Sequence, residues 1–310
     1  MSVPALRPSA KPAPEQRPDH PGTAGALLSA MRPRQWTKSL LVLAAPLAGG
    51  SLLSPGVALA VTLAVASFTA AACAVYLVND VHDAERDRLH PRKCLRPIAA
   101  GRLRPAAAQL AAAVLAGTAV AAPIVLRRPG LAVVVGLYLL LAAAYGRGLK
   151  HVPGVEIAIV AAGFLLRAVG GAVATGVPPS RWFLLVCTSG ALVAAFGKRC
   201  AELRQLGVLA VRSRPVLAHY TSRWLVAGRR LASIVTAGAY LAWAATRGGD
   251  VQRGLAMLSA LPFAAALVGY ARCNERGLGE SPEDLLLSDR PMQLLAAGWL
   301  LVYTAAVIAS

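Results

Sequence analysis

Long apolar runs decide what this chain can fold into. Polar connections separate the runs, which lie at residues 38–53, 56–78, 105–126, 131–145, 155–176, 182–196, 231–246, 255–270 and 292–309. A helix needs about 20 apolar residues to cross a bilayer, and the runs are near that length or somewhat shorter. Hydrophobic residues make up 56% of the chain and charged residues 15%, a balance that excludes an ordinary soluble domain. The sequence therefore predicts an all-α, polytopic membrane protein with nine transmembrane helices.

Basic residues are distributed unevenly between the two ends of these predicted helices. The net charge is +18, and most Lys and Arg residues fall within 1–38, 79–104, 146–151, 198–230 and 271–290. Because positively charged loops stay in the cytosol, we expect a protein of the cell inner (plasma) membrane with its N-terminus in the cytosol and its C-terminus outside. The charges lie in short loops rather than on one soluble module, which favours anionic substrates over nucleic acid as partners. A homo-oligomer is compatible with the sequence.

The chain divides into a short tail and a membrane domain. Residues 1–25 are rich in Pro, Ala and charged residues. They lack the apolar core of a signal peptide and predict a disordered cytosolic tail. Residues 26–310 form the predicted membrane domain. Within it, the basic loop 204–230 carries interleaved apolar residues, which predict an interfacial helix on an anionic leaflet or, alternatively, a gate over a substrate.

An acidic stretch, Asn79-Asp80-Val-His-Asp83-Ala-Glu-Arg-Asp87, follows the second apolar run. On a helix the three aspartates are spaced i, i+3 and i+7, which places them along one face with Asn79 beside the first. Such carboxylates repel one another unless a cation lies among them, and Mg²⁺ takes carboxylate oxygens together with substrate phosphates. The stretch predicts a Mg²⁺-diphosphate site in which Asn79, Asp80, Asp83 and Asp87 hold the metal and the aspartates are catalytic. A solvated loop of mixed charge is the alternative.

Several further charges are candidates for substrate contacts. Arg34 and Lys38, four residues apart, precede the first run and suit a phosphate group, although a membrane-topology anchor beside Trp36 explains them equally well. Lys93 and Arg96 lie just after the acidic stretch and suit phosphate oxygens that the metal does not cover. Other candidates lie in later segments. Glu156 is near the start of the fifth run, and Arg167 lies deeper in it, as a partner of backbone carbonyls or of a lipid phosphate. Arg290 contacts substrate or belongs to a helix cap.

The acidic stretch also carries a family resemblance. Tyr76-Leu-Val-Asn79-Asp80-Val-His-Asp83-Ala-Glu-Arg-Asp87, followed by Arg96-Pro-Ile-Ala-Ala-Gly101, resembles the first Asp-rich motif of the UbiA superfamily of intramembrane prenyltransferases. The resemblance covers about residues 30 to 309. It implies a ring of nine transmembrane helices around a central cavity that opens to the cytosol. It also implies that Asn79, Asp80, Asp83 and Asp87 bind a diphosphate through Mg²⁺, with Tyr76 among the substrate-binding residues.

A narrower resemblance modifies the implied reaction. The second Asp-rich motif typical of prenyltransferases is absent, since the corresponding place reads Gly197-Lys-Arg-Cys-Ala-Glu202-Leu. Five patches are instead similar to the decaprenyl-phosphate phosphoribosyltransferase branch: Arg32-Pro-Arg-Gln-Trp-x-Lys38, Tyr-Leu-Val-Asn-Asp, Gly148-Leu-Lys150-His, Gly197-Lys-Arg-x-Ala-Glu202-Leu, and Pro282-Glu-Asp with Asp289-Arg290. Ser39 and Cys200 depart from the pattern of this branch, where Asn and an aromatic residue are usual.

This branch implies a specific activity and specific roles. Its members transfer 5-phosphoribose from phosphoribosyl diphosphate to a polyprenyl (decaprenyl) phosphate and release diphosphate, for the synthesis of cell-wall arabinan precursors. Lys150, Lys198 and Arg199 are then candidate cations for the 5-phosphate, and Glu202 is a candidate for a ribose hydroxyl, a second metal or a helix cap. Two other functions remain open: a prenyltransferase that alkylates an aromatic acceptor, and a transporter or lipid-binding protein.

Overall fold

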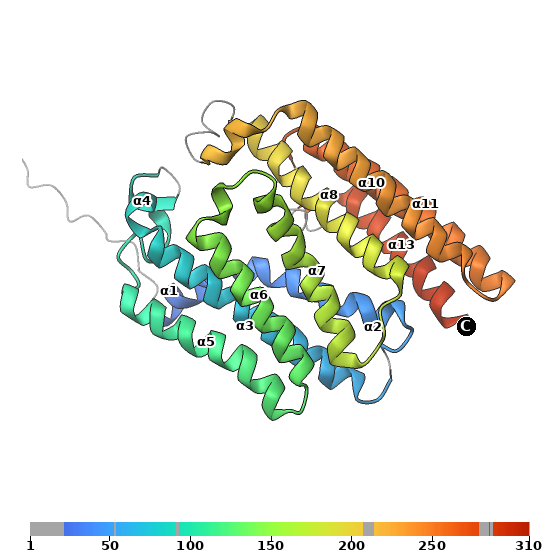
Figure 1. Cartoon of the computed structure of the whole chain (residues 1–310), viewed down its shortest axis with the longest axis horizontal. Helices are drawn as coiled ribbons and strands as arrows, with labels where there is room; N and C mark the ends of the chain where they lie inside the picture. The colour runs from blue at the N-terminus through green and yellow to red at the C-terminus, as the bar shows by residue number, and fades with distance from the viewer. Residues whose placement is uncertain are drawn as a thin grey trace, which may run out of the picture.

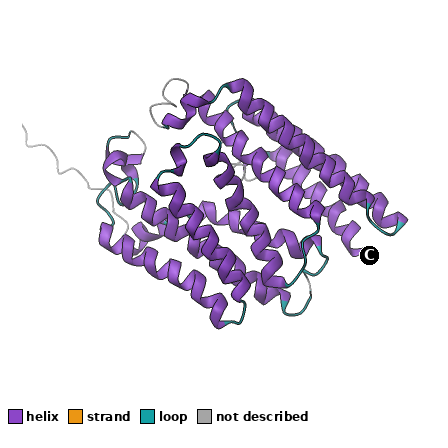
Figure 2. Cartoon of the chain, in the orientation of Figure 1, coloured by secondary structure: helices purple, strands orange, loops and turns teal. Residues whose placement is uncertain are grey.

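The described part of the chain is entirely helical (Figure 2). The computed structural model describes residues 22–52, 54–90, 93–206, 214–278, 285 and 288–309. Its elements, in chain order, are α1 (Thr23–Ala30), η1 (Pro33–Leu43), α2 (Ala44–Ala48), α3 (Val57–His82), α4 (Ala84–Arg88), η2 (Lys93–Leu95), α5 (Pro105–Val125), α6 (Pro129–Arg147), η3 (Leu149–His151), α7 (Val155–Thr175), α8 (Arg181–Leu206), η4 (Pro215–His219), α10 (Ser222–Ala245), α11 (Asp250–Glu275) and α13 (Arg290–Ile308). The prediction of an all-α chain is confirmed.

Seven of the described helices are long and apolar enough to cross a membrane: α3, α5, α6, α7, α8, α11 and α13. The first predicted span is a 3₁₀ segment, η1, which continues into the short helix α2. Pro46 lies within α2 and lacks the N–H that a longer helix needs. The seventh predicted span lies within α10, where Arg223, Arg229 and Arg230 reduce the apolar character of the first turns. A count of nine spans therefore stays a prediction.

Helix α1 begins at Thr23, close to the predicted end of the tail at residue 25, and residues 1–21 lie outside the described part, so the disordered tail stays a prediction. The predicted loop 204–230 is too long, because α8 continues to Leu206 and α10 begins at Ser222. Thr221 explains the early start of α10: its Oγ1 accepts a hydrogen bond from the Trp224 N–H at 3.2 Å, as a helix N-cap does. Residues 222–230, a third of that loop, thus belong to the helix that continues into the seventh predicted span.

The helices form two groups that meet at α7 and α8 (Figure 1). In the first group α3 packs against α5 and α6 and also contacts η1 and α7. In the second group α8 packs against α10, and α10 against α11, which pairs with α13. Small residues allow close approach at the contacts. A Cβ at Gly171 of α7 would collide with the backbone of Val42, and a Cβ at Gly197 of α8 would collide with Tyr270. Membrane helices commonly pack through such residues.

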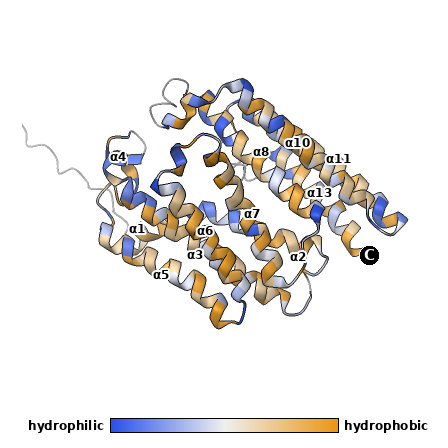
Figure 3. Ribbon diagram, in the orientation of Figure 1, coloured by the Kyte–Doolittle hydropathy of each residue, from blue (hydrophilic) through white to orange (hydrophobic). Residues whose placement is uncertain are grey.

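Polar residues collect at the ends of the bundle (Figure 3). One end brings together α4, the turn between α6 and α7, and the adjoining ends of α8 and α10. The acidic stretch, Lys150 and Lys198-Arg199 lie on these elements, so residues far apart in the sequence share one end of the molecule. This end is the one that the distribution of basic residues assigns to the cytosol.

Candidate active site

Asp80 of α3 and Asp87 of α4 form a buried carboxylate pair. Both residues are 3% exposed. Arg96 joins them, because its Nη1 lies 3.2 Å from Asp80 Oδ1 and 2.6 Å from Asp87 Oδ2. Asp80 Oδ1 also accepts a hydrogen bond from Arg32 Nη2 at 2.5 Å. Two carboxylates that converge on one cationic nitrogen would repel each other without it, so this position favours a cation.

Asp83 points to a different cation. Helix α3 ends at His82, and Asp83 has the backbone angles φ −90° and ψ 0°, after which α4 begins. The Asp83 N–H donates to the Asn79 carbonyl and the Asp87 N–H to the Asp83 carbonyl, which keeps the junction helical. The Asp83 carboxylate pairs with Lys150, whose Nζ lies 3.8 Å from Asp83 Oδ1. Asn79 lies half-buried one residue before the pair and faces Gly146 of α6. The expectation that all three carboxylates stack on one face is therefore met for two of them.

The donor chemistry of this cluster fits a hard divalent cation. Asp80, Asp87 and Asn79 offer carboxylate and amide oxygens, the ligands that Mg²⁺ prefers, and Mg²⁺ needs only one or two carboxylates from a protein when substrate phosphates supply the rest. Arg96 already holds the two carboxylates around one positive charge. No group of three His, Cys, Asp or Glu side chains is gathered for a metal within the described ranges.

Arg32 was not among the predicted site residues, but it is the arginine of the segment 32–38 that reaches Asp80. Its backbone is left-handed (φ 55°), an uncommon conformation for a residue with a side chain. The guanidinium lies over the Tyr76 ring, 5.0 Å from its centroid, and bonds to Asp80. Arg34 is exposed on η1. Because η1 is a 3₁₀ segment, Arg34 and Lys38 do not share one face as they would on an α-helix, and their substrate contacts stay predictions. Pro33 was the available sign that Arg32 precedes the helix.

A second charged cluster lies where α7 meets α8. Glu156 is fully buried and Arg199 is 1% exposed. Arg199 Nε lies 2.8 Å from Glu156 Oε1, its Nη2 lies 2.5 Å from Glu156 Oε2, and its Nη1 lies 2.6 Å from Glu202 Oε2. The guanidinium is thus enclosed by two carboxylates. These contacts favour a role for Arg199 and Glu156 in joining α7 and α8.

The comparison with known families decides what kind of protein carries these clusters. A model described as the UbiA prenyltransferase family matches residues 39–295. The chain belongs to the UbiA prenyltransferase family. It is therefore a multi-pass membrane protein and a membrane transferase, and the resemblance carried by the acidic stretch is confirmed.

Individual relatives of this UbiA family member have a common description. A Mycobacterium tuberculosis protein named decaprenyl-phosphate phosphoribosyltransferase is 43% identical over 285 residues, which cover 91% of this chain and 94% of the relative. A Corynebacterium glutamicum protein of the same name is 37% identical, over 92% of this chain and 87% of the relative. Among solved structures, a UbiA homolog from Archaeoglobus fulgidus bound to GPP and Mg²⁺ has a TM-score of 0.68 at 16% identity, over 92% of this chain and 100% of that one. This last match confirms the UbiA fold.

The remaining predicted site residues of this UbiA chain lie on α8, η2 and α13. Lys198 is half-buried and lies within electrostatic range of Lys38, Arg214 and Glu202. Lys93 is half-buried in η2. Arg290 is exposed at the first residue of α13, and no ion pair joins it to either cluster within the part described. Asp289 caps α13 by accepting a hydrogen bond from the Met292 N–H. The neighbouring Glu283 and Asp284 lie outside the described residues.

Arg167 makes the backbone contact that was one of its two expected roles. Its Nη1 donates to the Gly163 carbonyl at 2.5 Å and its Nη2 to the Tyr138 hydroxyl at 3.1 Å. The guanidinium also lies 4.7 Å from the centroid of the Tyr138 ring. These contacts solvate a positive charge in the middle of α7, which would otherwise be costly within a membrane.

A cavity of about 390 Å³ lies at the other end of the molecule. Its lining is mostly apolar and includes the aromatic residues Trp182, Tyr240, Trp243, Phe263, Trp299 and Tyr303. Trp182 and Arg199 are on the same helix and 17 residues apart, which corresponds to about 25 Å. The cavity is therefore separate from both charged clusters, and the expected central cavity open to the cytosol stays a prediction.

Proposed function

We propose that this chain transfers 5-phosphoribose from phosphoribosyl diphosphate to a polyprenyl phosphate, such as decaprenyl phosphate, and releases diphosphate. The observation that carries the proposal is the 43% identity to a decaprenyl-phosphate phosphoribosyltransferase over nearly the full length of both chains. A second feature supports it. Residues 197–203 contain one acid, Glu202, and that acid pairs with Arg199, whereas a prenyl diphosphate transferase would be expected to have a second Asp-rich metal site there.

The charges of the site suit this reaction. The bond from ribose C1 to the diphosphate oxygen breaks, and a bond from C1 to an oxygen of the lipid phosphate forms. The acceptor is already an anionic phosphate, so the site needs no strong base. It needs to orient two anionic substrates and to stabilise the charge of the leaving diphosphate. Arg32, Arg96 and Lys150 hold the three carboxylates in this structure, and we propose that they contact diphosphate oxygens.

Asn79, Asp80, Asp83 and Asp87 are the proposed residues for Mg²⁺. When bound, Mg²⁺ supplies positive charge that stabilises the leaving diphosphate. Lys198, near Lys38 and Arg214, is proposed to bind the 5-phosphate, at some distance from the aspartates. Arg199 and Glu156 are proposed to hold Lys198 in place through their mutual ion pair. Tyr76 is proposed to orient Arg32, because the guanidinium lies over its ring.

Removal of divalent cations is expected to abolish the binding of inorganic diphosphate. Without the metal, Arg32 and Arg96 neutralise the aspartates and leave little positive charge for a ligand. Isothermal titration calorimetry of the purified protein with diphosphate, with and without EDTA, measures this effect. Readdition of Mg²⁺ is expected to restore binding. Equal affinity in both conditions would show that the aspartates hold no metal-diphosphate complex.

Arg32→Met is expected to raise the KM for phosphoribosyl diphosphate by at least about tenfold, the effect of losing one charge-assisted contact. Arg34→Met is the matched control, because it removes the same guanidinium group from an exposed residue two positions further along the chain. Steady-state kinetics with saturating lipid phosphate compares the two variants. Equal effects of both substitutions would contradict the assignment of Arg32.

The orientation follows from the same proposal. We place the protein in the plasma membrane with its N-terminus and both charged clusters on the cytosolic side, where a soluble phosphoribosyl donor is available. The product would be a lipid-linked phosphoribose, a precursor of cell-wall arabinan. Ser2→Cys and Ser310→Cys variants test the orientation. A thiol reagent that does not cross the membrane, added to intact cells, is expected to label position 310 and not position 2.

A competition between donors tests the reaction class. Purified protein receives Mg²⁺ and decaprenyl phosphate with labelled phosphoribosyl diphosphate, or labelled prenyl diphosphate with an aromatic acceptor. The proposal predicts label in the lipid product only with the phosphoribosyl donor. Label transferred only from the prenyl donor would make the chain a prenyltransferase instead.

A further inference from the structure

We propose that Tyr220 and Arg214 are positioning residues that clamp the turn between α6 and α7, so that Lys150 faces Asp83. This inference rests on the proposed function, in which Lys150 contacts the donor. It assigns a role to residues 214–220, a segment that lies outside the aspartate site.

The clamp holds the turn at both of its ends. At the end of α6, the Tyr145 hydroxyl accepts a hydrogen bond from Arg214 Nη2 at 2.7 Å. At the start of α7, the Gly154 N–H donates to the Tyr220 hydroxyl oxygen at 2.7 Å. Lys150 lies between these two attachment points, on η3, and η3 also packs against η4. A segment of seven residues, 214–220, therefore spans the turn that carries Lys150.

The buried ion pair of the second cluster anchors the clamp. Tyr220 donates its hydroxyl proton to Glu156 Oε1 at 3.3 Å. Arg214 Nη1 lies 3.5 Å from Glu202 Oε2 and 3.9 Å from Glu156 Oε2. Burial raises the pKa of the Tyr220 phenol, so the hydroxyl keeps its proton at neutral pH. The clamp is thus tied to α7 and α8 through the carboxylates that enclose Arg199.

The turn needs an external support. Gly154 has φ +77°, a conformation that glycine adopts at no steric cost, and Gly146 and Gly148 lie on the other side of Lys150. The Lys150–Asp83 contact, at 3.8 Å, also joins elements that are about 70 residues apart in the sequence. A glycine-rich turn loses much conformational freedom when it is ordered. Fixing it in advance lowers the cost of placing Lys150 when the donor binds.

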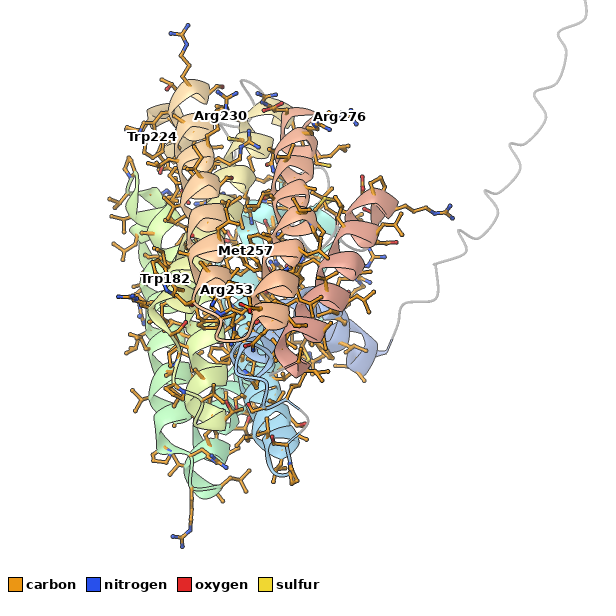
Figure 4. All side chains as sticks on the ribbon, turned by 90° about the vertical axis from the view of Figure 1, so that its right-hand side faces the viewer. Trp182, Trp224, Arg230, Arg253, Met257 and Arg276 are labelled. Carbon is orange, nitrogen blue, oxygen red and sulfur yellow. The ribbon has the colours of Figure 1, made fainter. Side chains whose placement is uncertain are left out.

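An aromatic stack holds the clamp at the edge of the bundle. The Tyr220 ring lies parallel to that of Trp224, with centroids 5.1 Å apart and an angle of 2°, and Phe196 of α8 packs on Trp224 edge to face. Trp224 is half-exposed near the same end of the bundle as Arg230 and Arg276 (Figure 4). The stack keeps the Tyr220 ring in place when only its hydroxyl is removed, which makes Tyr220→Phe a clean test.

A double-mutant cycle tests the clamp. Tyr220→Phe, Lys150→Met and the double variant are titrated with phosphoribosyl diphosphate and Mg²⁺ by calorimetry, without the lipid acceptor. We expect Tyr220→Phe to weaken binding about tenfold in the wild-type background. In the Lys150→Met background it is expected to have almost no effect, because the clamp acts through Lys150. Equal weakening in both backgrounds would overturn the inference.

Controls separate this inference from other effects. Arg214→Met removes the other end of the clamp, is expected to behave in the same way, and replaces Tyr220→Phe if that variant does not fold. Tyr240→Phe removes a buried hydroxyl that bonds Ser259 and Trp299 instead, and it is expected to leave donor affinity unchanged. The same cycle is measured with inorganic diphosphate. If the wild-type protein binds diphosphate but not phosphoribosyl diphosphate, the proposed function fails, while the cycle with diphosphate still decides whether Tyr220 acts through Lys150.

Discussion

Replacement of Asp80 by asparagine is expected to lower turnover at least about 100-fold, the loss typical of removing one charged contact to a developing anion. The substitution keeps the size of the side chain and its ability to accept a hydrogen bond from Arg32. It removes the negative charge that, in the proposed mechanism, holds Mg²⁺ beside the diphosphate. Because Asp87 continues to pair with Arg96, we expect the variant to fold and to keep its thermal midpoint in detergent within a few degrees.

Glu85→Gln is the matched control for Asp80→Asn. Glu85 belongs to the same acidic stretch, but its side chain is 94% exposed and pairs only loosely with Arg88 at 3.5 Å. Loss of this charge is expected to leave turnover unchanged. Full activity in Asp80→Asn, or equal loss in both variants, would remove Asp80 from the metal site.

Replacement of Arg199 by methionine is expected to have the largest effect on stability. The substitution leaves Glu156 fully buried without its main cation. Removing one partner of a buried ion pair typically costs about 3–5 kcal/mol. We expect a large fall in the thermal midpoint, measured by scanning fluorimetry in detergent, and a low yield of purified protein.

Two further variants check this explanation. Arg199→Met combined with Glu156→Gln removes both charges and is expected to recover much of the lost stability. Arg253→Met breaks a surface pair with the fully exposed Asp250, at the far end of α11 (Figure 4), and is expected to change the thermal midpoint little. A stable Arg199→Met protein would mean that the Arg199 guanidinium does not hold α7 and α8 together.

The sequence predicted the helical membrane fold and the place of the acidic stretch because both depend on local patterns. The apolar runs mark helices wherever they are long, and the acidic stretch follows one of them directly. The convergence of Asp80 and Asp87 was not predictable from their spacing, because seven helical residues span about 10 Å and the contact with Arg96 joins the two carboxylates. The pairing of Asp83 with Lys150 depends on a contact between segments far apart in the sequence, which no local pattern marks.

Contacts between distant segments account for the other differences. Arg32 and Arg34 are the same residue type in the same short segment. Arg32 differs in its left-handed backbone, and its guanidinium bonds to Asp80. Arg199 resembles a phosphate-binding residue until its pairing with Glu156, 43 positions away, is known. Tyr145, Arg214 and Tyr220 belong to no recognised motif. The bond from Arg214 to Tyr145 of α6, and the bond between Tyr220 and Gly154 at the start of α7, depend on tertiary packing.

The most direct test of the proposed reaction is to follow two labels of phosphoribosyl diphosphate, one in the 5-phosphate and one in the terminal phosphorus of the diphosphate. Wild-type protein is incubated with each donor, Mg²⁺ and decaprenyl phosphate, and the lipid and water phases are separated. If C1 is transferred, the 5-phosphate label enters the lipid phase and the diphosphate label stays in water as free diphosphate. Diphosphate label in the lipid, or no lipid label from either donor, would contradict the proposed function.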